Sequence, residues 1–214
     1  MWPYVLFDLD GTLTDPKMGI TKSVAFALNH FGITVENLDD LCCFIGPPLK
    51  ESFQTFYHMD DAQADEAVAR YREYFTRQGI YENAIFDGVD DMLASLVEQG
   101  KQVILATSKP AVYAQAILEH FNIAPYFRFV SGSELDGSRV KKAEVIAYAL
   151  AQCGIVDLTQ VVMVGDREHD IIGAKAIGVA SIGVTYGYGS YEELQAVGAE
   201  CIVATVAELG KILA

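Results

Sequence analysis

Two aspartates near the start of the chain, Asp8 and Asp10, follow an apolar run and are separated by one residue. In extended backbone, side chains two positions apart point to the same side, so both carboxylates can face one site. Burying carboxylates at the end of a core strand is unfavourable unless positive charge compensates for the lost hydration. We therefore expect a source of positive charge close to this pair.

Further polar side chains follow other apolar runs along the chain. They are, in order, Thr107, Ser108 and Lys109 after residues 103–106, Lys141 and Lys142 beyond the loop 132–137, and Asp166 and Asp170 after residues 161–164. In open α/β sheets, ligands bind outside the carboxyl ends of the strands. Carboxylates, hydroxyl groups and lysine are therefore expected to meet at one edge of a sheet.

This set of groups suits phosphoryl transfer. Carboxylate oxygens are ligands that Mg²⁺ prefers, and Mg²⁺ also binds phosphate oxygens. One carboxylate can attack phosphorus to give an aspartyl-phosphate. A second can protonate the leaving oxygen and later deprotonate a water molecule. A lysine and a hydroxyl group can stabilise the charge on the equatorial phosphoryl oxygens.

The elements that would position these residues are apolar runs that alternate with helical patterns. The runs are rich in valine and isoleucine without strict alternation, as in a parallel sheet covered on both faces. The expected strands are residues 4–7, 103–106, 127–131, 161–164 and 180–185, with a short sixth at 201–204. Gly100, Gly154 and Gly178 stand where helices would end. We predict an α/β fold with a Rossmann-like, three-layer core around a parallel sheet.

One region breaks this alternation. Between Asp15 and about Ala84 there is no convincing strand, but there are helical patterns at residues 20–31, 49–57 and 62–78. A crossover between parallel strands needs only about a dozen residues, and this stretch is much longer. We therefore predict an inserted all-α cap domain at residues 16–83, with the core formed by residues 1–15 and 84–214.

The overall charge and the apolar content limit the partners. The 214 residues carry a formal net charge of −14, and the basic residues are scattered. Nucleic-acid backbones are bound by clustered Lys and Arg, so we expect no nucleic-acid partner. No apolar stretch approaches the roughly 18 residues of a transmembrane helix, so we expect no membrane association. The four cysteines match no zinc motif and, without an export signal, indicate free thiols in the cytoplasm.

The motifs resemble those of the haloacid dehalogenase superfamily of phosphohydrolases. DLDGTLTD is similar to its first motif, Thr107 in LATSK to the second, Lys142 in KKAEVI to the third and GDREHD to the fourth. The helical insertion between the first and second motifs resembles the type 1 cap subclass. DPKMGITKSV, FIGPPLKESF, GSELDGSRVKKAEVI and GDREHDIIGAK resemble the branch of phosphoglycolate phosphatases and 5′-nucleotidases.

The resemblance implies a Mg²⁺-dependent hydrolase of small phosphomonoesters, phosphoglycolate or a nucleoside 5′-monophosphate, that acts through an aspartyl-phosphate. Asp8 would be the nucleophile, and Asp10 would be the general acid and base. The resemblance also implies that the Asp8 carboxylate, the Asp10 carbonyl oxygen and Asp166 hold the Mg²⁺ ion, with Asp170 acting through metal-bound water.

Thr107 and Lys142 would, by the same resemblance, bind the phosphoryl oxygens, and Ser108 is a further candidate for substrate binding. Several residues have a second interpretation. Thr107 and Ser108 can be a cap or turn before a helix that begins near residue 111. Lys141 is the alternative to Lys142, and Asp170 can cap the helix that follows it.

Substrate choice is expected to lie in the cap. Lys50, after the loop 46–49, either binds the anionic end of the substrate or belongs to a turn whose prolines start the next helix. Two other functions share the motifs. One is a phosphomutase of the β-phosphoglucomutase type, although the histidine usual there after the first motif is absent from residues 16–19. The other is a non-enzymatic binding protein on the same scaffold, although no catalytic residue is missing.

Overall fold

The computed structural model of the chain describes residues 2–214. The chain divides into two compact units: unit 1 comprises Met1–Asp15 and Ile85–Ala214, and unit 2 comprises Pro16–Ala84. The predicted second boundary, between residues 83 and 84, falls one residue before the observed one. Among residues 2–214, no helix has the length and apolar character needed to cross a bilayer.

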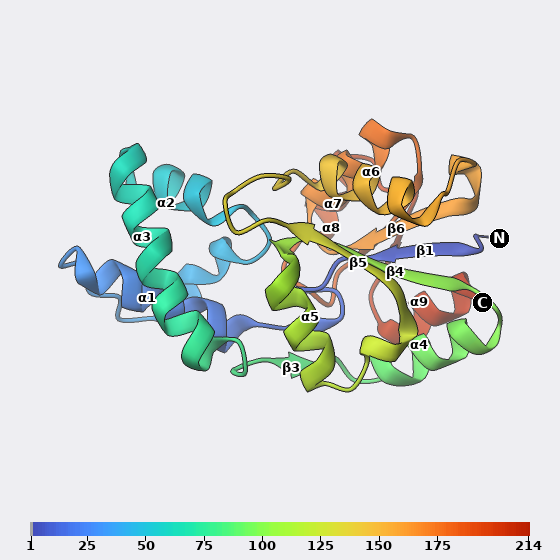
Figure 1. The fold of residues 1–214 in the computed structure, drawn as a ribbon, viewed down its shortest axis with the longest axis horizontal. Helices are drawn as coiled ribbons and strands as arrows, with labels where there is room; N and C mark the ends of the chain where they lie inside the picture. Colours follow the sequence, from blue (N-terminus) through green and yellow to red (C-terminus); the bar gives the residue numbers. More distant parts are fainter. Residues whose placement is uncertain (1) are drawn as a thin grey trace. The chain divides into compact units, whose positions relative to one another are not determined.

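Unit 1 is built on a six-stranded parallel sheet in the order β5-β4-β1-β6-β7-β8 (Figure 1). The strands are β1 (Tyr4–Phe7), β4 (Gln102–Pro110), β5 (Phe127–Ser133), β6 (Val161–Gly165), β7 (Ala180–Val184) and β8 (Cys201–Val203). The six predicted strands are thus confirmed, although β4 and β5 extend further than predicted. The sequence interpretation missed β2 (Thr14–Asp15) and β3 (Ala84–Ile85), which form a separate two-stranded sheet.

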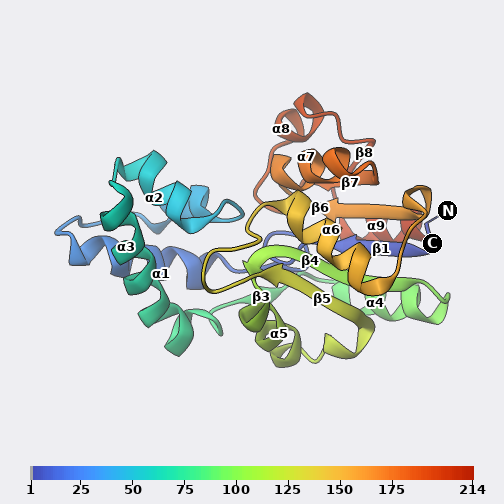
Figure 2. The ribbon, with the colours of Figure 1, turned by 45° about the horizontal axis from the view of Figure 1, so that its top comes forward.

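Helices cover both faces of the sheet (Figures 1 and 2). On one face lie α6 (Lys142–Cys153) and α7 (Glu168–Ile177), and on the other lie α4 (Val89–Glu98), α5 (Ala111–His120) and α9 (Val206–Leu213). A short helix, α8 (Tyr191–Ala196), follows β7, and the 3₁₀ turns Ala124–Tyr126 and Leu158–Gln160 precede β5 and β6. Both α6 and α7 end at a left-handed glycine, Gly154 and Gly178, as predicted. The three-layer α/β prediction is confirmed.

One core cluster lies between the sheet and α6. Leu6, Ile104 and Met163 from three neighbouring strands pack with Val145 and Ile146, and all five side chains are fully buried. Burying an aliphatic side chain of this size contributes roughly 1.5–3 kcal/mol. This packing fixes the ends of β1, β4 and β6 relative to the first turn of α6.

Unit 2 consists of helices. They are α1 (Lys17–His30), α2 (Leu49–Tyr57) and α3 (Asp61–Tyr74), with a 3₁₀ segment at Leu38–Phe44 and a π-helical turn at Phe75–Gly79. Helix α1 packs against α3 and both short segments. Asp60 and Gln63 form a capping box that starts α3. Aromatic side chains fill the core of this unit, and Phe44 and Phe53 are both fully buried with ring centroids 5.0 Å apart.

Candidate active site

The ends of three neighbouring strands define the candidate site. Phe7 of β1 is paired with Leu105 of β4 and with Val164 of β6. The next residue, Asp8, donates its backbone N–H to Val164 O at 2.9 Å. A side chain at position 8 is therefore held between the ends of β4 and β6, at the edge of an α/β sheet where ligands bind.

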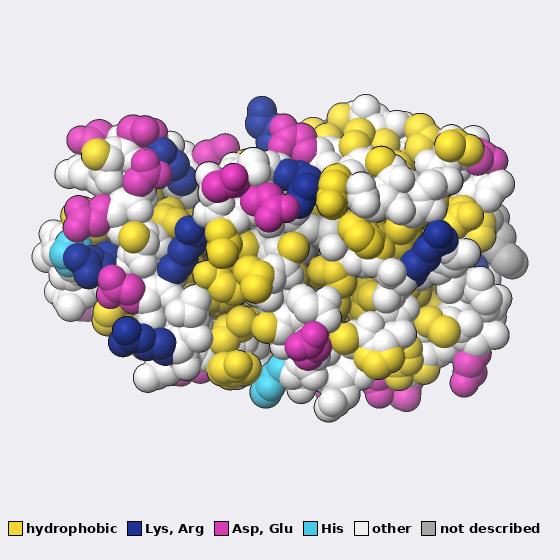
Figure 3. Space-filling model, in the orientation of Figure 1, with side chains coloured by type: hydrophobic (Ala, Val, Ile, Leu, Met, Phe, Trp, Pro, Cys, Tyr) yellow, Lys and Arg dark blue, Asp and Glu magenta, His cyan; other side chains and the backbone are white. Residues whose placement is uncertain are grey.

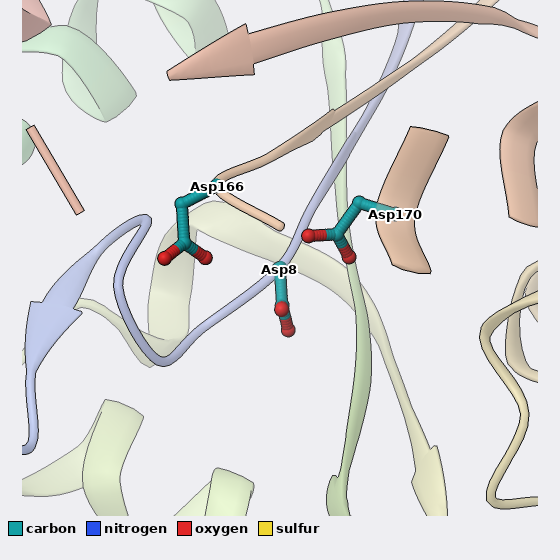
Figure 4. Close-up of side chains that lie close together, drawn as sticks. All are labelled: Asp8, Asp166 and Asp170. Carbon is teal, nitrogen blue, oxygen red and sulfur yellow. The ribbon is translucent and has the colours of Figure 1, made fainter. Parts of the chain in front are cut away.

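Three carboxylates meet at this point. Asp8 follows β1, Asp166 follows β6, and Asp170 lies in the first turn of α7. One oxygen of each lies within 4.8 Å of the others, and all three residues are buried. Figure 4 shows that the side chains come from separate segments of the chain, with Asp8 between the other two. The structure thus brings together carboxylates that are up to 162 residues apart in the sequence (170 − 8).

Lys142 places a buried positive charge among these carboxylates. Its Nζ lies 2.9 Å from Asp8 Oδ1 and 2.8 Å from Asp170 Oδ1, and it donates a hydrogen bond to Ala106 O at 3.1 Å. Burial alone would lower the pKa of this ammonium group, but the two carboxylates raise the pKa above its usual value. Lys141 is exposed, so Lys142 is the lysine that reaches the site.

The two oxygens of Asp170 have different partners. Oδ1 forms the ion pair with Lys142, and Oδ2 accepts the backbone N–H of Arg167 at 3.1 Å at the start of α7. Asp170 therefore caps its helix and also belongs to the carboxylate cluster, so the two interpretations are compatible. The Asp170 carboxyl group lies directly against the backbone of Gly165. Any larger residue at position 165 would bring a Cβ atom that overlaps this carboxyl group.

Asp10 is paired with a different lysine. Its Oδ2 forms an ion pair with the ammonium group of Lys109, and its buried Oδ1 has no hydrogen-bond partner among residues 2–214. Burial raises the pKa of Asp10, and Lys109 opposes that shift. The sequence interpretation assigned Lys109 no role, although it placed the residue at the correct edge. The feature of the sequence that indicates this ion pair is a lysine at the end of one strand, expected at the same sheet edge as the two carboxylates that follow another.

Thr107 and Ser108 lie in the last residues of β4, whereas the sequence pattern predicted them after its end. The register between β4 and β5 shifts between Ala106 and Pro110, so this stretch leaves the regular ladder. Thr107 is buried, and its Oγ1 accepts the backbone N–H of Lys109 at 3.3 Å. The interpretation of Thr107 as a helix cap is wrong, because the N-cap of α5 is Pro110 and has no side-chain hydrogen bond. Ser108 is half-buried.

Lys50 lies in unit 2, in the first turn of α2. Its ammonium group pairs with Asp61 at 2.9 Å and with Asp65 at 2.8 Å, both on α3. Figure 3 shows basic side chains scattered among acidic ones on the face that it draws. Lys50 therefore has anionic partners within its own unit, and its contact with a substrate stays a prediction.

The backbone packs closely around Asp166. A Cβ atom on Gly11 or Gly187 would overlap the Asp166 carboxyl group, and one on Gly189 would overlap the Asp166 carbonyl oxygen. Asp166 Oδ2 accepts the backbone N–H of Tyr188 at 2.8 Å. The alternating glycines of the segment 186–189 were the signal in the sequence for such close packing, and no role was inferred from them.

The electrostatics of the cluster favour a bound cation. Burial raises the pKa of Asp166 well above its usual value, and the nearby carboxylates Asp170 and Asp8 raise it further. Burial also raises the pKa of Asp170, to about 6, against the opposing effect of Lys142. A divalent cation would offset this charge, and a set of carboxylate oxygens fits Mg²⁺. The donor set of the site therefore fits a magnesium ion.

In the metal-free protein, lowering the pH from about 7.5 to about 5 is expected to raise the free energy of unfolding by about 1–3 kcal/mol through Asp170. The pKa of Asp170 is about 6 in the folded protein, compared with an ordinary value of 3.8. The folded state therefore takes up the proton first as the pH falls, and its stability rises through this window. Urea unfolding in EDTA measures the effect.

The matched control for this measurement is Asp170→Asn, which has no carboxyl group to titrate at this position. A wild-type protein with the same pH dependence of unfolding as this variant would contradict the raised pKa. Saturating Mg²⁺ is expected to abolish the difference, because a cation favours the charged carboxylate.

Comparison with known proteins gives three kinds of match. Residues 5–184 match the family model of haloacid dehalogenase-like hydrolases. The chain is 50% identical over 195 residues to a 5′-nucleotidase from Pseudomonas aeruginosa, which covers 91% of this chain and 88% of that protein. A crystal structure of a predicted phosphatase from Clostridium acetobutylicum has a TM-score of 0.97 and 49% identity, and the match covers 100% of this chain and 98% of that one.

Other relatives carry different names. A tyrosine-protein kinase, PtkA of Mycobacterium tuberculosis, is 42% identical over 185 residues, which are 86% of this chain but only 62% of PtkA. A phosphoglycolate phosphatase from Colwellia psychrerythraea is 27% identical, over 96% of this chain and 94% of that protein.

Proposed function

The chain belongs to the haloacid dehalogenase-like hydrolase family, and we propose that it is a Mg²⁺-dependent phosphatase of small phosphomonoesters, with nucleoside 5′-monophosphates as its preferred class. The observation that carries the proposal is the buried cluster of Asp8, Asp166 and Asp170 with Lys142 among them. The preference for nucleotides over phosphoglycolate is supported by the 50% identity to a 5′-nucleotidase, compared with 27% to a phosphoglycolate phosphatase.

Asp8 is the proposed nucleophile of the first step. Its Oδ1 accepts the N–H of Leu9 at 2.7 Å and pairs with Lys142, so the carboxylate is held rigidly at the strand end. Attack on phosphorus forms the aspartyl-phosphate bond as the bond to the leaving oxygen breaks. Asp10 donates a proton to that leaving oxygen, and the ion pair of its Oδ2 with Lys109 leaves the buried Oδ1 free for the transfer.

Asp10 acts as a base in the second step. It takes a proton from the water molecule that attacks the phosphoryl group, and the Asp8 carboxylate is released with inorganic phosphate. Thr107 and Lys142 would bind the phosphoryl oxygens. The Mg²⁺ ion would be held by Asp8, Asp166 and the Asp10 carbonyl oxygen, with Asp170 acting through water, and it would supply positive charge for the phosphoryl group.

Unit 2 is the proposed cap. Its closure over the substrate would exclude water during the first step and admit it for the second. The choice of substrate is assigned to this unit, because the core meets only the phosphate that all phosphomonoesters share. Lys50 remains the candidate for contact with the substrate, and such a contact would compete with the ion pairs that Lys50 makes with Asp61 and Asp65.

The purified protein is expected to release phosphate from p-nitrophenyl phosphate and from nucleoside 5′-monophosphates with Mg²⁺, and to lose this activity in EDTA. If the substrate pocket makes specific contacts with the nucleoside, kcat/KM for nucleotides should be at least about ten-fold above that for phosphoglycolate. Steady-state phosphate release across a substrate panel measures both. Conversion of β-glucose 1-phosphate to glucose 6-phosphate, or transfer from ATP to a tyrosine peptide without phosphomonoester hydrolysis, would contradict the proposal.

A further inference from the structure

The segment that follows β7 contacts both the carboxylate cluster and Asp15, the residue at which the chain leaves unit 1. We call residues 186–189 the YGYG loop. Tyr188 donates its backbone N–H to Asp166 Oδ2 at 2.8 Å, and its hydroxyl group donates a hydrogen bond to Asp15 Oδ1. Asp15 is the last residue of unit 1 before the chain enters unit 2. Tyr188 therefore holds Asp166 with its main chain and Asp15 with its side chain.

Tyr186 makes further contacts of the same loop. Its hydroxyl group donates to Thr12 O at 3.0 Å, and its ring meets the ring of Phe86 edge-on at a centroid distance of 5.2 Å. Burial raises the pKa of Tyr186, so the hydroxyl group remains a donor at neutral pH. Phe86 comes directly after Ile85, where the chain re-enters unit 1. The YGYG loop thus contacts residues at or next to both points where the chain passes from one unit to the other: Asp15, where it leaves unit 1, and Phe86, just after it returns.

The two glycines of the loop permit this close packing. A Cβ atom on Gly187 would overlap the carbonyl oxygen of Gly11, and one on Gly189 would overlap the carbonyl oxygen of Asp166. The loop backbone is therefore pressed directly against the segment after β1 and the segment after β6. Close-packed backbone of this kind transmits displacement from one segment to the other.

We propose that Tyr188 is a positioning residue that couples Asp15, where the chain leaves unit 1, to the Asp166 carboxylate. The proposal rests on the proposed magnesium site and adds a connection between that site and the chain segment that leads into unit 2. Magnesium at Asp166 fixes the Tyr188 main chain, and the Tyr188 hydroxyl group then fixes Asp15. By linkage, the factor by which bound magnesium favours the held conformation of Asp15 equals the factor by which that conformation raises the affinity for magnesium.

Metal affinity tests the coupling without any substrate. Tyr188→Phe removes only the hydroxyl group and keeps the N–H that Asp166 accepts. We expect this variant to bind Mg²⁺ about five-fold more weakly in isothermal titration calorimetry, because Asp166 is less well positioned before binding. Asp15→Ala should have the same effect, and the double variant should lose no more than either single variant.

Two control variants separate the hydrogen bond from other causes. Asp15→Asn removes the charge but keeps an acceptor oxygen for the Tyr188 hydroxyl group, and it should bind Mg²⁺ within about two-fold of wild type. Tyr191→Phe changes an exposed tyrosine at the start of α8 and should also behave as wild type.

Hydrogen exchange provides a second measurement on the same proteins. Mg²⁺ should slow exchange in a peptide that spans residues 13–22 of the wild-type protein, which contains none of the proposed metal ligands, and this protection should be lost in Tyr188→Phe. Independent losses of affinity that multiply in the double variant, or protection that persists in Tyr188→Phe, would overturn the coupling and leave the magnesium site intact. A wild-type protein that binds no Mg²⁺ in calorimetry would overturn the proposed metal site and the coupling together.

Discussion

Asp8→Asn is expected to reduce Mg²⁺-dependent phosphate release by a factor on the order of 10⁴ or more, because removing a nucleophile from a cooperating set abolishes nearly all of its catalysis. The asparagine amide cannot form the aspartyl-phosphate. Asp8 lies at the centre of the carboxylate cluster and is held by both Leu9 and Lys142. Initial rates with p-nitrophenyl phosphate at saturating Mg²⁺ give the activity.

The fold of this variant is checked by thermal unfolding, so that inactivity is not confused with loss of structure. A second measurement follows the intermediate itself: wild-type protein quenched in acid during turnover should carry a covalent phosphoryl group that Asp8→Asn lacks. Near-normal activity in the folded variant would show that another group attacks phosphorus.

Lys142→Met is expected to reduce both activity and stability. The buried ammonium group pairs with Asp8 and Asp170 at 2.9 and 2.8 Å. Removing one partner of a buried ion pair leaves uncompensated charge and costs about 3–5 kcal/mol of unfolding free energy. Removing a group that stabilises phosphoryl oxygens should also lower kcat by about 10²–10³-fold. Urea unfolding in EDTA at neutral pH and steady-state kinetics measure the two effects.

Lys141→Met is the matched control, because the neighbouring lysine is exposed and its loss should change stability by no more than about 0.5 kcal/mol. The instability of Lys142→Met should shrink as the pH falls, since Asp170 becomes protonated. Equal losses in the two variants would contradict the assignment of position 142 as the buried lysine of the site.

The strands could be predicted from the sequence because fully buried parallel strands are continuous apolar runs. The runs 4–7 and 161–164 have this character, and the structure has strands there. The two-residue strands β2 and β3 have no such signal, since two residues cannot show a period. The end of β4 was predicted too early, because Thr107, Ser108 and Lys109 look like a polar loop although the backbone stays extended to Pro110.

Some residues of the candidate site could be placed from the sequence, and others could not. Asp8 and Asp166 follow apolar runs directly, so their convergence could be predicted from the parallel topology alone. The choice of Lys142 over Lys141 came from family resemblance, and burial in the structure separates the two. The contact between Tyr188 and Asp166 could not be predicted, because a backbone N–H donates the hydrogen bond and every residue except proline has one.

The pairing of β2 with β3 also affects how this chain can diversify. The chain leaves unit 1 at Asp15 and re-enters it at Ile85, on two strands that are paired in one small sheet. The residues between them form a loop whose ends are already closed, and doubling the length of such a loop adds only about 0.6 kcal/mol of closure entropy. Evolution or protein engineering can therefore exchange this module for a shorter or longer one, and under the proposed cap role each exchange would offer a new substrate range to the same hydrolytic machinery.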